Sequence, residues 1–522
     1  MLIGDILSMN ADRSPEKIAL ITDEGTISYR QLEETANRIA NALIALGVGK
    51  GQRIALIEKT CAGCIEVASA IVKTGAILVT VNNLLRPREL TKLLRDCDPG
   101  VLIFGKGYEN LVGQIRSDLP GIRRYLCLGH SDWAPELNNE TKAAPIDRPA
   151  VTISEEDVFT LLYTAGTTGD PKAAMFTHRA FWLNLLTTVI DTYKQTCDDI
   201  WLGPVPMYHI GGYGTLMRVL LMSNSLILKD RFDPSDYLST IEEENVTILY
   251  AYPTMINAMI QSPAPNERDF SSLRLVVYGG SPIPEATLEK AYEIFQCDFV
   301  QRYGATECCG SAILILSPEH HRLALSETRL DKGILQSAGK PCLGARVRLL
   351  DENNRKVKVP GKTGTLLAQL DAPMKGYWRA PHETAKVFQD GWLRLGDIAR
   401  FDEDGFYYLV DREKDMIVSG ARNIYPREVE EALYSHPAIK EASVIGVPDE
   451  YWGEAVKAVV VLKSGAETTE EELITYCRQQ LASYKKPKSV DFVDSLPKNP
   501  GGKIIKKELR QKYWKDRARY IH

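Results

Sequence analysis

The chain contains the stretch Tyr163-Thr164-Ala165-Gly166-Thr167-Thr168-Gly169-Asp170-Pro171-Lys172, which directly follows an apolar run at 158–162. Its glycines allow backbone N–H groups to approach an anion closely, its threonines add hydroxyl donors, and Lys172 adds a positive charge. The stretch differs from the P-loop of nucleoside triphosphatases because no Gly-Lys-Ser/Thr closes it. A plain flexible turn is the alternative. The order and composition of the stretch favour a phosphate-binding loop that follows a strand.

The sequence before this loop predicts an α/β fold. Ser28 and Gln31 have the spacing of a capping box, and an amphipathic helix is expected to follow them. Strands are expected at 53–58 and 77–82, with the helix 62–74 between them. Such alternation of strands and helices favours a largely parallel sheet.

The pattern changes near residue 340. Short strands separated by Gly, Pro and Asp are expected at 345–350, 364–369 and 405–410, which predicts a mainly β subdomain. The charged run 411–415 then precedes about 110 residues with an α/β pattern of their own.

We therefore predict two unequal domains. The large N-terminal domain, residues 1–412, consists of parallel α/β sheets plus the small β subdomain. The C-terminal domain, residues 413–522, is small and α+β. A chain of 522 residues is too long for one ordinary domain, since about 150 residues per domain is typical.

Charge and cysteine content restrict the class of protein. The chain has 63 Lys and Arg against 68 Asp and Glu, so bulk charge predicts no nucleic-acid partner. The most apolar stretch, 61–81, contains Glu66 and Lys73, so we expect no integral membrane segment. The N-terminus lacks the basic start of a signal peptide, and ten scattered cysteines suit a reducing compartment. We expect a cytoplasmic protein.

Several motifs in a fixed order resemble those of the adenylate-forming superfamily, which includes acyl-CoA synthetases, adenylation domains of peptide synthetases and firefly luciferase. The loop at 163–172 is similar to the family loop, although Ala165 replaces a Ser and Ala173 a Gly. Four further motifs are Tyr-Gly-Ala-Thr-Glu at 303–307, Leu-Gly-Asp at 395–397, Asp-Arg-Glu-Lys-Asp at 411–415, and Ser-Gly-Ala-Arg-Asn-Ile-Tyr-Pro at 419–426. The last motif, at 496–503, ends in Gly-Gly-Lys, and the resemblance covers nearly the whole chain.

The resemblance implies an ATP site, with a tyrosine on the adenine, an aspartate on both ribose hydroxyls and an arginine on the ribose. The residues implied for ATP and AMP are Thr164, Gly166, Thr167, Thr168, Gly169, Lys172, Gly279, Gly280, Ser281, Tyr303, Gly304, Asp397 and Arg412.

The resemblance also implies catalytic roles. Thr306 contacts the α-phosphate, Glu307 holds Mg²⁺, and Lys503 is the catalytic lysine. Lys414 is implied as the hinge of a mobile C-terminal domain, and Gly420 as the wall of the coenzyme A tunnel. The other lysines of the tail, such as Lys506, are expected to be solvated. Cys308 and Cys309 are expected to pack rather than react.

The acyl pocket is less well defined by the sequence. His209 directly precedes an expected helix, and we also count it among the catalytic candidates. The alternative is that His209 has only a structural role. The residues expected to line the pocket are Tyr208, His209, Tyr252 and Tyr278. An uncharged lining without an aspartate disfavours an amino acid, so a fatty acid of medium or long chain and an aromatic acid both stay open.

These expectations describe an AMP-forming carboxylic acid–CoA ligase of fatty acid metabolism or aryl-acid activation. Its partners are a small-molecule carboxylic acid, ATP and CoA, with Mg²⁺ as cofactor. A ligase that loads a carrier protein and a non-catalytic nucleotide-binding homologue are the alternatives. The sequence does not decide the oligomeric state, so a homodimer stays open.

Overall fold

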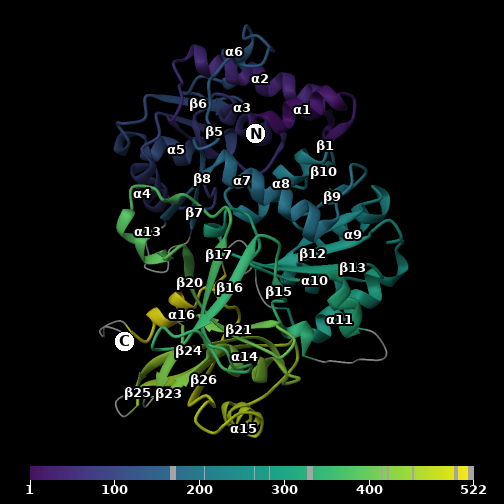
Figure 1. The fold of residues 1–522 in the computed structure, drawn as a ribbon, viewed down its shortest axis with the longest axis vertical. Coiled ribbons are helices and arrows are strands. Elements are labelled where there is room, and N and C mark those ends of the chain that lie inside the picture. The colour runs from purple at the N-terminus through teal and green to yellow at the C-terminus, as the bar shows by residue number, and fades with distance from the viewer. Residues whose placement is uncertain are drawn as a thin grey trace.

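The computed structural model describes residues 1–164, 172–204, 206–263, 265–280, 283–325, 333–412, 415–419, 422–449, 452–498 and 504–514. Within these ranges the strands form four sheets, the last of which lies at the yellow-green end of the molecule in Figure 1. The alternation of strands and helices predicted from the sequence is confirmed.

The first sheet is mostly parallel and contains the two strands that flank the predicted phosphate loop. Its strands lie in the order β18 (Gly376–Tyr377), β8 (Lys172–Thr177), β7 (Val158–Thr164), β4 (Ile77–Thr80), β3 (Arg53–Ile57), β5 (Val101–Gly105) and β6 (Arg124–Leu128). β7 and β8 are antiparallel, and Thr164 is paired with Lys172 across the two strands. The loop 165–171 therefore connects two strands of a hairpin, whereas a P-loop leads from a strand into a helix.

The second sheet has the order β15 (Lys340–Pro341), β14 (Leu314–Leu316), β13 (Asp298–Tyr303), β12 (Leu275–Gly279), β11 (Ile248–Ala251), β9 (Ile200–Leu202), β10 (Ser225–Ile227), β1 (Ile18–Thr22) and β2 (Gly25–Ser28). The neighbours from β13 through β12, β11 and β9 to β10 are parallel. Their carboxyl ends therefore meet at one edge, which is where open α/β sheets bind ligands.

Helices cover both of these sheets. They are α1 (Asp5–Arg13), α2 (Tyr29–Ala45), α3 (Ala62–Lys73), α4 (Pro87–Cys97), α5 (Glu109–Ile115), α6 (Leu137–Thr141), α7 (His178–Thr187), α8 (Ile210–Leu221), α9 (Pro234–Glu243), α10 (Pro253–Ile260), α11 (Glu285–Phe295) and α12 (Pro318–Leu325). One core cluster contains apolar residues of α2, α3, α7 and α8 together with residues of both sheets. The capping box predicted for α2 is present, since Ser28 and Gln31 each accept a hydrogen bond from the other's backbone N–H.

The third sheet is antiparallel and confirms the predicted β subdomain. It consists of β16 (Ala345–Leu350), β17 (Gly364–Leu370), β20 (Trp392–Phe401) and β19 (Phe388–Gln389), with β21 (Tyr407–Arg412) paired to β20. The helix α13 (Pro381–Val387) lies beside it. Because β20 and β21 are directly paired, Asp397 stands opposite Arg412.

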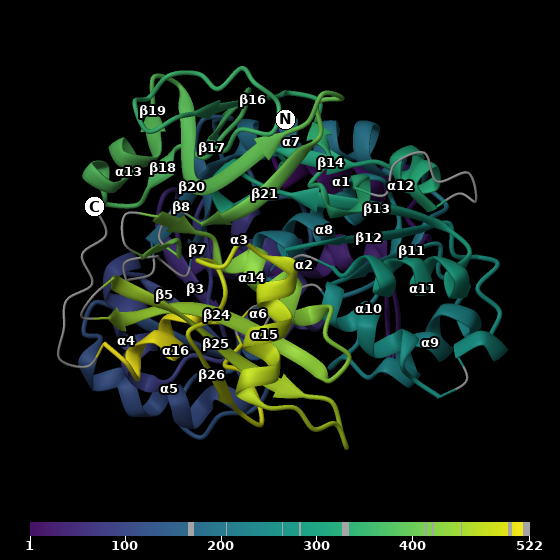
Figure 2. The same cartoon turned by 90° about the horizontal axis from the view of Figure 1, so that it is seen from below.

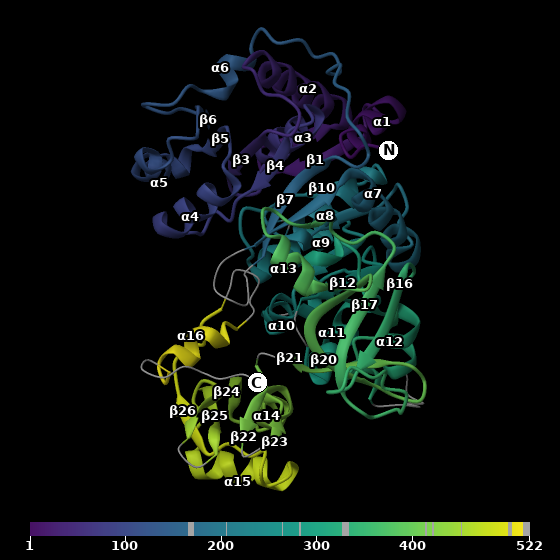
Figure 3. The same ribbon diagram turned by 60° about the vertical axis from the view of Figure 1, so that its left-hand side comes forward.

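The last elements form a separate lobe at the end opposite α2 and α6 (Figures 1 and 3). In Figure 2, which is seen from below, these elements lie toward the viewer. The lobe contains β22 (Ile417–Ser419), β23 (Arg422–Ile424), β24 (Ile439–Asp449), β25 (Gly453–Leu462) and β26 (Ser489–Phe492), with the helices α14 (Pro426–Tyr434), α15 (Glu470–Gln480) and α16 (Lys506–Gln511). It has hydrophobic clusters of its own. Among the helices of the described ranges, none is both long and apolar enough to cross a membrane.

Candidate active site

Three predicted nucleotide residues meet at the carboxylate of Asp397. The Tyr303 hydroxyl donates to its Oδ2 at 2.6 Å, and Nε of Arg412 lies 3.1 Å from its Oδ1. Burial, reinforced by the Asp397 carboxylate, raises the pKa of Tyr303, so this hydroxyl stays protonated and donates. Burial disfavours the charge of Arg412, but the nearby acidic groups, Asp397 foremost, together outweigh it, and the pKa of Arg412 lies above its ordinary value. The three motifs therefore build one preorganised polar site.

Glycines at the ends of β12 and β13 allow close backbone packing beside this site. A Cβ added to Gly279 would lie 2.4 Å from the carbonyl oxygen of Arg302, and one added to Gly304 would lie 2.8 Å from that of Ser311. Gly280 has a φ of +83°, a conformation that side chains disfavour. Gly279, Gly280 and Tyr303 thus lie at the carboxyl ends of adjacent parallel strands.

Glu307 and Lys172 are connected through Tyr377, which the sequence did not indicate. The Tyr377 hydroxyl donates to Oε1 of Glu307 at 2.5 Å, and Nζ of Lys172 lies 5.5 Å from the centre of the Tyr377 ring. Lys172 also forms an ion pair with Glu383 of α13. Lys172, followed by Lys386, lowers the pKa of Glu383 to about 2. The loop lysine therefore lies over the tyrosine that holds the predicted Mg²⁺ ligand, and it pairs with an unpredicted carboxylate.

Thr306 begins the single 3₁₀ turn Thr306–Cys308 that also carries Glu307. Cys308 and Cys309 have no exposed surface, and burial raises the pKa of each thiol. The expectation that these two cysteines pack rather than react is confirmed.

Two of the residues predicted for the acyl pocket, Tyr208 and His209, directly precede α8. His209 caps this helix, and its Nδ1 accepts from the N–H of Gly211 at 3.0 Å. The residue as a whole is exposed, yet desolvation of the imidazole lowers the pKa of His209, so the ring is mostly neutral at pH 7. Tyr250, a residue that the sequence did not indicate, has its hydroxyl 2.7 Å from where a Cβ of Gly211 would lie.

The predicted tyrosines differ in their surroundings. Tyr252 contacts the edge of the Tyr250 ring, with 5.6 Å between ring centres, and lies 3.7 Å from where a Cβ of Gly280 would be. Tyr208 is half-buried. Tyr278 has no exposed surface, and its hydroxyl lies 2.8 Å from Nε2 of His321. The acyl roles of all three stay predictions, and the Tyr278 ring packs against Phe299 and His321.

Several predicted residues lie outside the described ranges. They are Gly166, Thr167, Thr168, Gly169, Ser281, Lys414, Gly420 and Lys503. Their roles stay predictions.

The junction between the predicted domains contains a charged cluster. Both oxygens of Asp411 accept backbone hydrogen bonds, from Arg412 N at 2.6 Å and from Arg427 N, in the first turn of α14, at 3.1 Å. Burial raises the pKa of Asp411 to about 6. Lys506 is not solvated as expected, because its Nζ lies 2.9 Å from Oε1 of Glu430 and its side chain is mostly buried. The expectation for Lys506 was wrong since the tail helix packs against β24.

Comparison with known proteins agrees with this site. Residues 7–378 match the family model of the AMP-binding enzyme, and residues 428–503 match that of the AMP-binding enzyme C-terminal domain. The chain is 34% identical to the fatty acid–[acyl-carrier-protein] ligase ScoC of Streptomyces coeruleorubidus, over 99% of this chain and 97% of that protein. It is 36% identical to a feruloyl-CoA synthase of Amycolatopsis sp, over 96% and 97%.

The fold also matches a solved structure. The anthranilate CoA ligase AuaEII in complex with anthranoyl-AMP superposes with a TM-score of 0.88 at 29% identity, over 98% of this chain and 97% of that chain. The chain therefore belongs to the AMP-binding enzyme family, and it is an AMP-forming acid–thiol ligase of the acyl-CoA synthetase type that uses ATP and coenzyme A.

Proposed function

We propose that the enzyme activates a fatty or aromatic carboxylic acid as its acyl-adenylate at the edge formed by β11, β12 and β13, and then transfers the acyl group to CoA. The observation that carries this proposal is the convergence of Tyr303 and Arg412 on the carboxylate of Asp397. Tyr303 ends β13, next to the end of β12, where Tyr252 approaches Gly280. The named substrates of the relatives, a fatty acid and a feruloyl group, support the same two acid classes.

The first half-reaction joins two anions. A carboxylate oxygen attacks the α-phosphorus of ATP, the new O–P bond replaces the bond to the β-phosphate, and pyrophosphate leaves. Such a step depends on positioning and on charge neutralisation. Asp397 would accept the ribose hydroxyls, Lys172 would bind the departing phosphates, and Lys503 would bridge the carboxylate and the α-phosphate. His209, neutral at pH 7, would border the acyl group without adding a charge to the pocket.

Glu307 suits a Mg²⁺ ligand. Mg²⁺ in such sites is held by one or two carboxylates together with substrate phosphates, and the described residues contain no cluster of three or more His, Cys, Asp or Glu side chains that would form a closed metal site. Tyr377 orients the Glu307 carboxylate through Oε1. The bound ion would neutralise phosphate charge.

In the second half-reaction the thiol of CoA attacks the acyl carbonyl, a C–S bond forms and AMP leaves. We propose that residues 413–522 move as a mobile domain about Lys414, which withdraws Lys503 and presents Gly420.

All ten cysteines are free thiols in the structure, which supports a cytoplasmic enzyme. The absence of a nucleic-acid partner and the homodimer stay predictions.

A carrier protein is the second candidate acceptor, because ScoC is named for one. The acid-dependent conversion of ATP to AMP and pyrophosphate, measured over a panel of fatty, aromatic and amino acids, tests the proposed activation. Parallel reactions with CoA and with a phosphopantetheinylated carrier protein then compare the acceptors. We expect turnover with fatty or aromatic acids and a CoA thioester; turnover with amino acids alone would contradict the proposal.

A further inference from the structure

Arg218 is a buried guanidinium without a carboxylate partner in the described part of the chain. It lies on α8 with 1% of its surface exposed. Its Nε and Nη1 have no hydrogen-bond partner among the described residues, and Nη2 is 3.4 Å from the hydroxyl of Thr215 on the same helix. Burial lowers its pKa only to about 10, so the group is still charged at pH 7. A buried charge in this state is costly unless an anion joins it.

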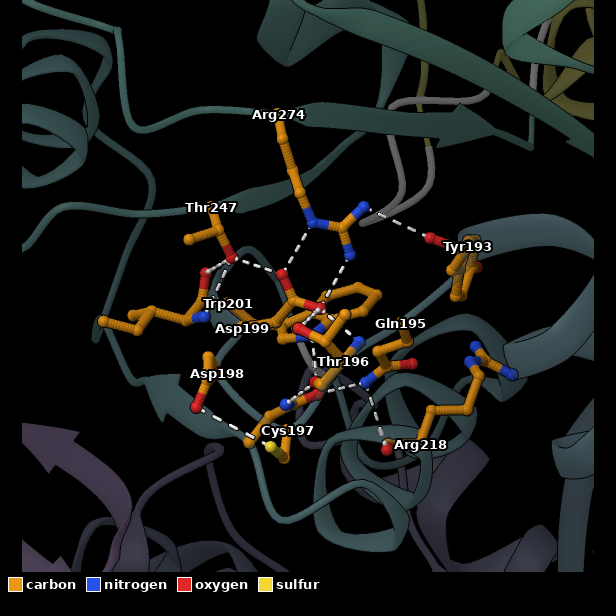
Figure 4. A network of polar contacts seen from close by, with 12 residues as sticks. Tyr193, Gln195, Thr196, Cys197, Asp198, Asp199, Trp201, Arg218, Thr247 and Arg274 are labelled. Carbon is orange, nitrogen blue, oxygen red and sulfur yellow. Dashed lines mark hydrogen bonds and ion pairs between the residues drawn. The ribbon is translucent and has the colours of Figure 1, made fainter.

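The nearest carboxylate network does not supply that anion. Asp199 receives a fork from Arg274, with Nε 2.7 Å from Oδ1 and Nη2 2.6 Å from Oδ2. It also accepts from Thr247 and from the backbone of Thr196. Figure 4 shows these bonds, and it shows Arg218 joined to the network only through its backbone carbonyl, which accepts from Gln195. Arg274 is therefore compensated and Arg218 is not.

A second arginine lies at the same place. The guanidinium carbons of Arg218 and Arg302 lie 5.5 and 5.4 Å from the centre of the Tyr193 ring. Arg302 donates to the Tyr193 hydroxyl at 2.8 Å and to the carbonyl of Gly310 at 3.0 Å, and both acceptors are neutral. Two positive charges thus share one region and repel each other, which a bound anion would relieve.

The Arg218 side chain extends toward the N-terminal end of α8, which His209 caps. A Cβ on Gly214 would lie 3.1 Å from its Nη1, so the guanidinium lies over the preceding turn of α8. Gly211 lies on the same face, facing the Tyr250 hydroxyl next to His209. Gly211 and Gly214 are about 4.5 Å apart along the helix axis, given a rise of 1.5 Å per residue. The absence of side chains at both positions leaves the guanidinium close to the residues expected to border the acyl group.

We propose that Arg218 binds a second carboxylate of the substrate, so that the preferred acid is an aromatic or fatty dicarboxylic acid. This inference rests on the proposed function, because it requires the acyl group to lie at the start of α8. One carboxylate reacts with ATP, and the other accepts from Nε and Nη1 of Arg218 with Arg302 nearby. Such a charge-assisted fork is specific for a carboxylate, and an acid without the second carboxylate leaves the buried donors unpaired.

The experiment compares pairs of acids that differ only in the second carboxylate, such as cinnamate with 4-carboxycinnamate and hexanoate with adipate. Acid-dependent ATP–pyrophosphate exchange is measured for the wild type, Arg218→Met and Arg218→Lys, with Arg30→Met as the control because Arg30 forms an exposed pair with Glu16. We expect the wild type to prefer a diacid. Arg218→Met should lose about 10²–10³-fold in kcat/KM for that diacid and little for its monoacid. Arg218→Lys should keep part of the preference.

Two further readouts separate the explanations. Without substrate, Arg218→Met should melt at a higher temperature than the wild type, since it removes an uncompensated buried charge; a lower melting temperature would contradict the premise. If no acid supports exchange in the wild type, the proposed function fails. If exchange occurs but monoacids and diacids are used equally, or Arg218→Met and Arg218→Lys both leave the preference unchanged, the proposed role of Arg218 is overturned and the proposed function stands.

Discussion

At the scale of single residues, Asp397 is positioned before any nucleotide binds. Its side chain is 9% exposed, and its two oxygens are held by groups from different strands, Tyr303 at the end of β13 and Arg412 on β21. A carboxylate held in this way needs little reorganisation to accept ribose hydroxyls. The loss of this carboxylate should therefore impair the use of ATP.

Asp397→Asn should lower kcat/KM for ATP by about 10²-fold, because an amide offers one acceptor oxygen and loses the charge that Arg412 pairs with. Steady-state exchange kinetics at varied ATP measure the effect. Asp351→Asn is the control, since Asp351 accepts from backbone N–H groups of an exposed turn. An unchanged kcat/KM for ATP in Asp397→Asn would contradict the assigned role.

Glu383 forms an ion pair with Lys172, the lysine that we expect to bind phosphate. ATP would have to displace the Glu383 carboxylate from Lys172. Glu383→Gln should therefore lower the KM for ATP by about two- to fivefold, the range expected for loss of a partly exposed ion pair. The matched control is Glu16→Gln, which breaks the exposed pair with Arg30. A raised KM would instead indicate that Glu383 holds Lys172 in its binding position.

At the scale of elements, patterns confined to one segment were predictable from the sequence. The capping box of α2, the strand Ala345–Leu350 and the start of α14 at Pro426 were all expected, because each depends on neighbours in the chain. Asp397 and Tyr303 were named through the resemblance, but the contact between them was not.

Contacts between distant segments were not predictable in this way. Lys172 and Glu383 are 211 residues apart in the sequence, and Tyr377 reaches Glu307 from a strand 70 residues away. The buried charge of Arg218 sits in the apolar helix 210–221, whose pattern indicates only burial. The packing of whole elements against one another creates these pairs, so the local spacing of residues does not predict them.

Asp411, which accepts a hydrogen bond from the first turn of α14, should make the free energy of unfolding depend on pH. The pKa of Asp411 in the fold is about 6, above its ordinary value, so the native state binds a proton more tightly than the unfolded chain. Its contribution is favourable below the unfolded pKa and is lost as pH rises from about 4 to about 6. As pH rises through this range, the free energy of unfolding should therefore fall less in Asp411→Asn than in the wild type, because the amide resembles the protonated carboxyl group.

Urea unfolding at pH 4.5, 5.5 and 6.5 measures this difference, with the exposed Asp404→Asn as the control. Equal pH dependence of the wild type and Asp411→Asn would show that Asp411 does not titrate in this window.

At the scale of the whole molecule, the two family matches, 7–378 and 428–503, lie on either side of the charged junction. Polar contacts cross this junction: Oδ2 of Asp411 accepts from the backbone N–H of Arg427 at 3.1 Å, and Nη1 of Arg427 donates to the carbonyl oxygen of Leu409 at 2.7 Å. The lobe thus has its own core and a polar attachment, an arrangement that suits the proposed rotation of a domain.

The rotation predicts that the half-reactions can be lost separately. Lys503→Ala should abolish adenylation but still convert supplied acyl-AMP to thioester, because the lysine serves the first step alone. Gly420→Leu should adenylate normally and fail in thioester formation, since a side chain there would block the thiol. Exchange assays and thioester assays on the same preparations distinguish the steps. Loss of the same half-reaction in both variants would contradict the model.

The most direct test of the account is rapid-quench mass spectrometry of the purified wild type with an accepted acid and MgATP. Without CoA, the acyl-adenylate should accumulate to about one equivalent per active site, with release of pyrophosphate. Addition of CoA should then convert it to acyl-CoA and AMP. Formation of ADP with an acyl phosphate, or of thioester without a preceding acyl-adenylate, would contradict the account.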